Sequence, residues 1–189
     1  MITSGKKTKK QAIYILFFGG YDITATIIKG VTNAPYVHTA LSLTPSLDSI
    51  YSFNIKLMLE QLRPYLKNGL YVESIKNYDK KIPYWLYRIE VTHRQYQKIE
   101  KIIQKLKKHP NMCSYNIPGA LGFLYPEFWE NVQKKQKYSF TCSEFIAFML
   151  ETSGIVTFDK PLHMIAPLDI INLKQLKQIK KGIVGELQE

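Results

Sequence analysis

The chain has 189 residues, enough for one domain of ordinary size, and 46% hydrophobic against 22% charged residues exclude a disordered or collagen-like chain. Its two cysteines, Cys113 and Cys142, exclude a disulfide-rich scaffold and favour free thiols. The net charge of +11 invites a nucleic-acid or membrane partner, but the lysines fall where solvated helix faces and tails are expected, without a nucleic-acid motif. We therefore expect no specific nucleic-acid binding, and only peripheral attraction to anionic membranes.

The N-terminal residues 1–11 are basic, with four lysines between Lys6 and Lys10. The apolar run that follows, Ala12 to Phe18, is seven residues long and lacks a small-residue cleavage site, which favours a buried strand over a signal peptide. No window approaches the roughly 18 apolar residues of a membrane span. We therefore expect a basic tail on a soluble, cytoplasmic protein.

The next elements alternate between short helix and strand. Asp22 is a suitable N-cap for a helix over 23–29, which Gly30 would end. Small and β-branched residues then predict a strand over 36–43 that carries His38. Turn residues at 44–48 lead into an alternating segment over 49–54, so the two strands are expected to form a hairpin.

The middle of the chain contains one undecided region and two clear elements. Residues 56–63 could form a helical piece before Pro64, and residues 69–73 a strand or a loop. Aromatic and β-branched residues predict a strand over 84–91. Thr92 can then cap a helix that His109 and Pro110 end, and its buried face is predicted from the spacing of Tyr96, Ile99, Ile102, Ile103 and Leu106.

The clearest local signal lies around Cys142. Thr141 and Glu144 stand in the Thr-x-x-Glu relation of a capping box, which makes Thr141 the N-cap and Cys142 the first helical residue. Gly154 is a suitable C-terminal stop. Glu144 is then better explained as a capping residue than as a catalytic acid. A last strand or helix is expected over 170–180.

Cys142 is a candidate nucleophile because a helix N-terminus and a nearby imidazole both lower the pKa of a thiol. The capping pattern provides the helix N-terminus. His38 is the best imidazole candidate, since a structural role for it is not evident on a strand of small and β-branched residues. Considered alone, Cys142 could equally be a small hydrophobic core residue.

The order of these elements resembles a known family. An apolar strand, a short helix, a strand with His38, its hairpin partner and, much later, a Cys-Ser-Glu-Phe helix start at Cys142 are similar to the circularly permuted papain-like branch of the NlpC/P60 superfamily. The YiiX/YaeF-like amidase group is the nearest match, and its relatives include the lecithin retinol acyltransferase type. In ordinary NlpC/P60 enzymes the Cys helix precedes the His strand, whereas here the His strand comes first.

The resemblance implies an α+β fold with an antiparallel sheet packed against the Cys-bearing helix, in a single domain over 12–180 with a C-terminal tail over 181–189. It also implies that His38 takes the thiol proton while Cys142 attacks a carbonyl and forms a thioester. The family usually places a polar residue on the following strand to orient the imidazole. Ser52 and Asn54 share one face of that strand, and either could accept from the ring N–H.

The resemblance implies a cysteine hydrolase of the amidase or peptidase class, acting on a peptide, amide or lipid-ester substrate, and we expect it to need no metal or other cofactor. Two alternatives stay open. One is a lipid acyltransferase or thioesterase of the same fold at an anionic membrane surface. The other is an inactive binding module in which Cys142 is buried and inert. The backbone N–H of Cys142 is a natural oxyanion donor, and the sequence offers no second one.

Overall fold

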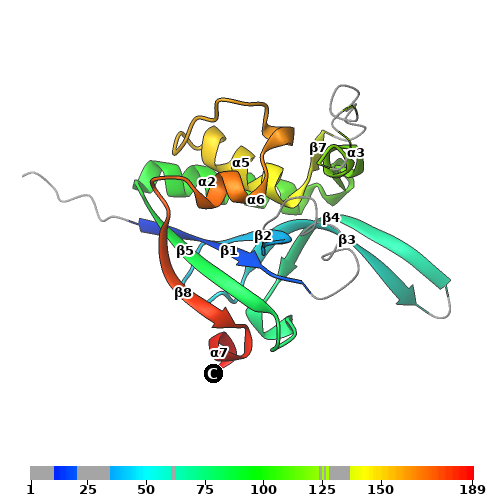
Figure 1. The fold of residues 1–189 in the computed structure, drawn as a ribbon. Coiled ribbons are helices and arrows are strands. Elements are labelled where there is room, and N and C mark those ends of the chain that lie inside the picture. Colours follow the sequence, from blue (N-terminus) through cyan, green and yellow to red (C-terminus); the bar gives the residue numbers. More distant parts are fainter. Residues whose placement is uncertain (1–10, 21–34, 61–62, 124, 126, 128–136) are drawn as a thin grey trace, which may run out of the picture.

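The computed structural model describes residues 11–20, 35–60, 63–123, 125, 127 and 137–189, and within 55–68 it describes the backbone alone. Its centre is a six-stranded sheet in the order β4-β3-β2-β1-β5-β8, with every neighbouring pair antiparallel (Figure 1). The strands are β1 (Gln11–Phe18), β2 (His38–Ser42), β3 (Ile50–Glu60), β4 (Arg63–Glu73), β5 (Pro83–Val91) and β8 (Lys177–Ile183). The expected α+β class and antiparallel sheet are confirmed.

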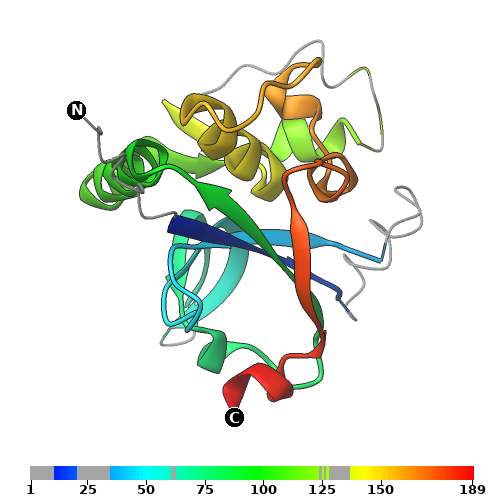
Figure 2. The same ribbon diagram turned by 90° about the vertical axis from the view of Figure 1, so that its left-hand side faces the viewer.

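Most helices lie on one face of this sheet, as both ribbon views show (Figures 1 and 2). That layer holds α2 (His93–Lys108), η2 (Pro110–Met112), α3 (Ile117–Leu121), α5 (Cys142–Thr152), η3 (Leu162–Met164), α6 (Pro167–Ile171) and a small parallel sheet of β6 (Cys113–Tyr115) and β7 (Tyr138–Phe140). The opposite face carries the short segments η1 (Ile75–Asn77) and α7 (Gly185–Gln188). In the described part of the chain, no helix combines the length and hydrophobicity needed to cross a membrane.

Both faces of the sheet are buried at the central strand β1, which explains why β1 is apolar at nearly every position. Ile15 and Phe17 point into a core beneath the helices, whereas Leu16 and Phe18 point into a second core on the opposite face. We call these the helix-side core, which includes Ile13, Ile15, Phe17, Leu41, Tyr51, Phe53, Phe145 and Met149, and the second core, which includes Leu16, Phe18, Ala40, Leu47, Ile50, Ile75, Tyr84 and Val184.

Several predicted elements are confirmed. The strand over 13–18 is β1, the strand over 84–91 is β5, and the expected hairpin forms between β2 and β3. Thr92 caps α2 through a complete capping box with Gln95, and the helix ends before His109 as expected. Its buried residues, Ile99, Ile103 and Leu106, belong to the predicted apolar face.

Of the segment 56–63, for which the sequence left a helical piece open, the described residues up to Glu60 form a strand and not a helix. β3 runs on to Glu60 and pairs with β4 along its whole length, from Ile50 opposite Glu73 to Glu60 opposite Arg63. The continuous ladder of cross-strand hydrogen bonds outweighs the weak helix preference of a short segment. Pro64 is tolerated because β4 is an edge strand, where one side of the backbone needs no partner.

The C-terminal residues also differ from the prediction, because 181–189 do not form a tail. β8 continues to Ile183 with Lys181 opposite Trp85, and Val184 is fully buried in the second core. The last element expected over 170–180 divides into the end of α6 and the start of β8. The helix expected over 23–29 and the tail up to residue 10 lie outside the described residues.

Candidate active site

Helix α5 begins at Cys142, as the capping pattern predicts. The Thr141 hydroxyl accepts a hydrogen bond from the Glu144 N–H at 3.1 Å, and the Glu144 carboxylate accepts one from the Thr141 N–H at 3.2 Å. The Glu144 side chain is fully buried and also accepts from the Asn116 side-chain amide at 3.0 Å. Glu144 therefore fixes the start of α5 to the segment between β6 and α3, which confirms its capping role.

The other end of α5 is fixed as firmly. Gly154 has a φ of +68°, its N–H donates to the Glu151 carbonyl, and the Ile155 N–H donates to the Leu150 carbonyl. This pair of bonds is a Schellman motif, which requires the left-handed conformation that glycine adopts readily. Between its two ends α5 packs on β2 and β3, with the Phe145 ring 5.0 Å from that of Phe53. The position of Cys142 above the sheet is thereby set.

The thiol of Cys142 lies among hydrogen-bond donors, although the residue is only 8% exposed. Burial raises the pKa of Cys142 above its ordinary value. The backbone and the side chain of Thr39, followed by the backbone of Ser143 and of Cys142 itself, act in the opposite direction and lower the pKa. Burial prevails, so the thiol is protonated at neutral pH in this state.

Thr39 can approach the thiol because β3 is not paired with β2 at this point. The β2–β3 ladder joins Leu41 to Tyr51 and Ser42 to Ile50, and stops before reaching Thr39. Thr39 is fully buried and faces the helix side of the sheet, opposite Phe17 of β1. Its hydroxyl has no hydrogen-bond partner of normal geometry within the described ranges.

The structure does not bring His38 and Cys142 together. His38 is the first residue of β2 and lies opposite Phe18, and their rings stack with centroids 6.2 Å apart. Phe18 belongs to the second core, and successive strand residues point to opposite faces. The imidazole is therefore on the face away from α5, while the next residue, Thr39, contacts the thiol.

Ser52 and Asn54 share a face of β3, as predicted. Tyr51 and Phe53 belong to the helix-side core, so the alternation of the strand places Ser52 and Asn54 on the opposite face, which is also the face of His38. Ser52 is 1% exposed, and its hydroxyl makes no hydrogen bond to any group in the described part. Three of the four predicted site residues thus share one face, and Cys142 lies on the other.

Two residues near the thiol were not singled out by the sequence. One is Thr39, whose only signal is its position next to His38. The other is Tyr115 of β6, where burial first, and then the negative charges of ionised Cys142 and of Glu144, raise the pKa of the phenol. Tyr115 therefore remains protonated and can donate a hydrogen bond. No motif marks it, because β6 is placed at the site by pairing with β7 and by contacts with β3 and β4, elements distant in the sequence.

The remaining histidines lie elsewhere. The imidazole of His93 is hydrogen bonded to the Gln11 side chain at 2.8 Å, and His109 caps the C-terminus of α2. His163 lies in η3, which packs on α5 where the Ser143 hydroxyl donates to the Ile165 carbonyl at 2.6 Å. The Nε2 atom of His163 is buried, and within the described ranges it has no hydrogen-bond partner.

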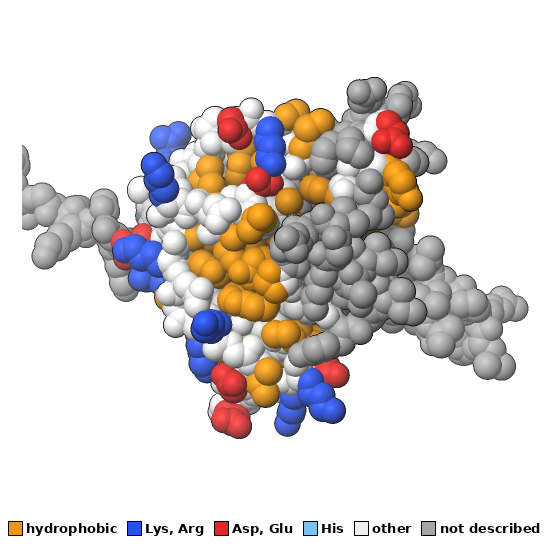
Figure 3. Space-filling model, in the orientation of Figure 1, with side chains coloured by type: hydrophobic (Ala, Val, Ile, Leu, Met, Phe, Trp, Pro, Cys, Tyr) orange, Lys and Arg blue, Asp and Glu red, His pale blue; other side chains and the backbone are white. Residues whose placement is uncertain are grey.

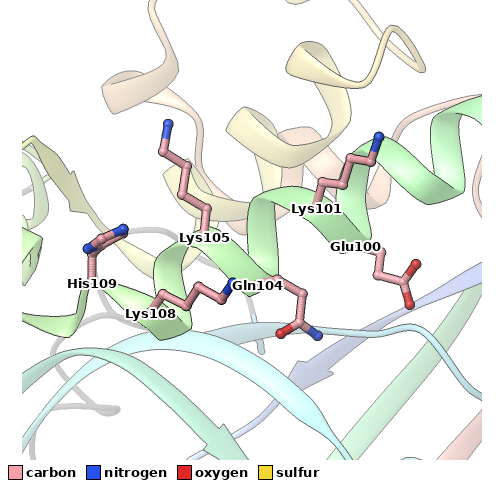
Figure 4. A pocket seen from close by; sticks show the side chains of 6 residues that line it. All are labelled: Glu100, Lys101, Gln104, Lys105, Lys108 and His109. Atoms are coloured by element: carbon pink, nitrogen blue, oxygen red, sulfur yellow. The ribbon is translucent and has the colours of Figure 1, made fainter.

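A groove of about 410 Å³ follows the exposed side of α2 and is lined by Glu100, Lys101, Gln104, Lys105, Lys108 and His109 (Figure 4). The ends of the Lys101 and Lys105 side chains point away from the sheet, whereas Glu100 and Gln104 point toward it. This groove does not include Cys142. Among the residues described, three or more His, Cys, Asp or Glu side chains are nowhere grouped so that they could hold a metal ion.

The fold and site therefore define an α+β protein with a buried thiol at the capped start of a helix, against the helix-side face of an antiparallel sheet. Comparison with models of protein families, with curated proteins and with solved structures gives no match.

Proposed function

We propose that the protein is a thiol-dependent acyl-transfer enzyme, a cysteine hydrolase of the amidase or peptidase class with Cys142 as its nucleophile. The observation that supports this best is the set of donors around the Cys142 sulfur, namely the N–H groups at the start of α5 and Thr39. Such donors stabilise negative charge on the thiolate and on an oxyanion formed beside it. The strand with His38 precedes the helix with Cys142, an order similar to that of the permuted papain-like branch of the NlpC/P60 superfamily. This resemblance suggests the amidase or peptidase class of reaction.

The reaction would follow thioester chemistry. A base removes the thiol proton, the sulfur forms a bond to the carbonyl carbon, and the C=O electron pair moves to oxygen. Collapse of this intermediate expels the amine or alcohol, which takes up the proton. Water then attacks the thioester, releases the acid and restores the thiol.

His38 is the proposed base, and its action requires a change at the start of β2. Its backbone adjoins Thr39, which contacts the thiol, so the imidazole lies one strand position from the site. Rotation of this first strand residue toward α5 would bring the ring to the helix-side face. The structure then corresponds to a resting state in which the thiol is protonated and enclosed.

The test is acylation of the intact protein by p-nitrophenyl acetate, with the modified cysteine located by peptide mass spectrometry. Cys113 is an internal control, because it is also a buried free thiol but its sulfur faces the Leu106 and His109 carbonyls, which do not stabilise a thiolate. We expect the acetyl group on Cys142. In His38→Ala the rate should fall about 10²- to 10⁴-fold, whereas His93→Ala should leave it unchanged.

The non-enzymatic alternative is favoured by two observations, the raised pKa of Cys142 and the position of the His38 ring on the second-core face. In that case the chain is a binding module on a similar fold. Acylation of Cys142 would then be no faster than that of Cys113, and it would not respond to removal of His38. That result would refute the enzymatic proposal.

A further inference from the structure

Burial of the Thr39 hydroxyl is energetically unfavourable, because no neighbouring group in the described residues offers it a hydrogen bond of normal geometry. The residue is 0% exposed in a central strand, and in the described part of the chain its hydroxyl has no partner of normal hydrogen-bond geometry, only the Cys142 sulfur beside it. A buried hydroxyl without a partner is unfavourable, and valine has nearly the same shape and suits a strand. The hydroxyl lies on the side of β2 that faces Cys142.

Backbone N–H groups also lie near the Cys142 sulfur. Cys142 and Ser143 are the first two residues of α5, an 11-residue helix, so their N–H groups have no carbonyl of that helix to bond. The third N–H, of Glu144, is already bonded to Thr141. The backbone of Thr39 also acts on the sulfur, at a position of β2 that lies beyond the end of its pairing with β3. Donors from a helix and from a strand thus converge on one atom.

We infer that Thr39 supplies the second oxyanion donor, which stabilises the tetrahedral intermediate together with the Cys142 N–H. This inference rests on the proposed acyl-transfer function and adds a residue to its machinery. When the sulfur bonds to a carbonyl carbon, the oxygen that receives the C=O electron pair lies within one bond of that carbon. Donors that already surround the sulfur are then within reach of this oxygen. The Thr39 hydroxyl, which has only the weakly accepting sulfur beside it in the resting state, gains a stronger oxygen acceptor.

The competing explanation is that Thr39 acts only on the thiolate by lowering the pKa of Cys142. The two roles differ in which reactions they affect. Alkylation by iodoacetamide is displacement at a saturated carbon, so it depends on the thiolate but forms no oxyanion. Acylation by p-nitrophenyl acetate depends on the thiolate and also passes through an oxyanion. The ratio of the two rates at Cys142 therefore isolates oxyanion stabilisation.

The experiment measures both rates at Cys142 in the full chain for the wild type, Thr39→Val, Thr39→Ser and Ser153→Ala. We expect the ratio of acylation to alkylation to fall about 10²-fold in Thr39→Val, the usual effect of losing one oxyanion donor. Thr39→Ser keeps the hydroxyl and should restore the ratio. Ser153 is a matched control, because its hydroxyl is also buried without a described partner but lies at the far end of α5.

Each result decides a different claim. An unchanged ratio in Thr39→Val, with the wild type acylating normally, overturns the role of Thr39 and leaves the proposed function intact. Equal loss of both rates assigns Thr39 to the thiolate alone and also overturns the inference. Failure of the wild type to acylate, while it is still alkylated, overturns the proposed function and the inference with it. Circular dichroism of each variant confirms that the fold is retained.

Discussion

Thr39 gives a stability prediction opposite in sign to its expected effect on acylation. Its buried hydroxyl has no described partner of normal geometry and lies beside the Cys142 sulfur, a weak acceptor, so removing the hydroxyl removes a poorly compensated polar group and leaves the shape of the side chain almost unchanged. We expect Thr39→Val to raise the free energy of unfolding by about 1 kcal/mol, measured by urea denaturation. A loss of stability would show that the hydroxyl has a structural partner, and would remove the argument that function maintains it.

The start of α5 could be predicted from the sequence, whereas the face on which His38 lies could not. Thr141, Glu144 and Cys142 were placed correctly because a capping box is a relation between residues three positions apart. The face on which His38 lies depends instead on its pairing with β1, and a difference of one residue exchanges the two faces. Thr39 therefore occupies the place that was assigned to His38, with no local signal to distinguish them.

The helices α2 and α5 both begin with a capping box, and the two boxes differ in how far they are buried. Thr141 and Thr92 each accept a hydrogen bond from the backbone of the third helical residue, but Thr141 is buried whereas Thr92 is exposed. Alanine at an exposed N-cap leaves N–H groups that water can solvate, and typically costs about 1 kcal/mol. At the buried start of α5 water cannot replace the lost bond, so the unsatisfied donor adds its own penalty.

We therefore expect Thr141→Ala to lower the free energy of unfolding by about 2 kcal/mol and Thr92→Ala by about 1 kcal/mol. Urea denaturation of both variants, with Thr141→Ser and Thr92→Ser as matched controls, measures the difference. Equal losses would mean that the start of α5 is as accessible to water as that of α2. Water would then reach the surroundings of Cys142 more readily than the 8% exposure of this residue indicates.

The elements that were predicted wrongly share a physical cause. Residues 56–60 have no strong periodicity, and their strand conformation comes from pairing with 63–67 along the β3–β4 ladder. Helices such as α2 and α5 were predicted because caps and apolar faces are encoded within the helix itself. Pairing between distant strands has no such local code, which is why the C-terminal strand β8 was also missed in part.

At the scale of the whole molecule, the surface combines apolar and basic areas. Figure 3 shows apolar side chains gathered near the centre of one face, with both basic and acidic side chains spread around them. The side chains of Lys101 and Lys105 on α2 point away from the sheet (Figure 4). The net charge of +11 favours weak, salt-dependent attraction to anionic surfaces. Peripheral membrane contact stays a prediction.

The last residues of the described chain close the second core. Val184 is fully buried there, and the Gln188 side-chain amide donates to the carbonyls of Ile75 and Tyr78, both at 2.9 Å. β8 pairs with β5 immediately before this point. On the face of His38 and Ser52 the sheet is thus covered in part by a C-terminal segment that is bonded to the connection between β4 and β5, more than a hundred residues earlier in the chain.

Removal of residues 181–189 distinguishes this arrangement from a tail. A tail could be removed with no measurable effect, whereas loss of buried Val184 and of part of the β5–β8 ladder should lower the free energy of unfolding by at least about 2 kcal/mol. Val184→Ala in the full chain is the matched control, and it should lose about 1 to 2 kcal/mol because it removes two buried methyl groups. If the truncated protein and Val184→Ala both unfold at the wild-type urea concentration, the second core is complete without the C-terminus. If both are destabilised and Cys142 still reacts normally, the two faces of the sheet are independent, and the change proposed at His38 would not need the C-terminal segment to move.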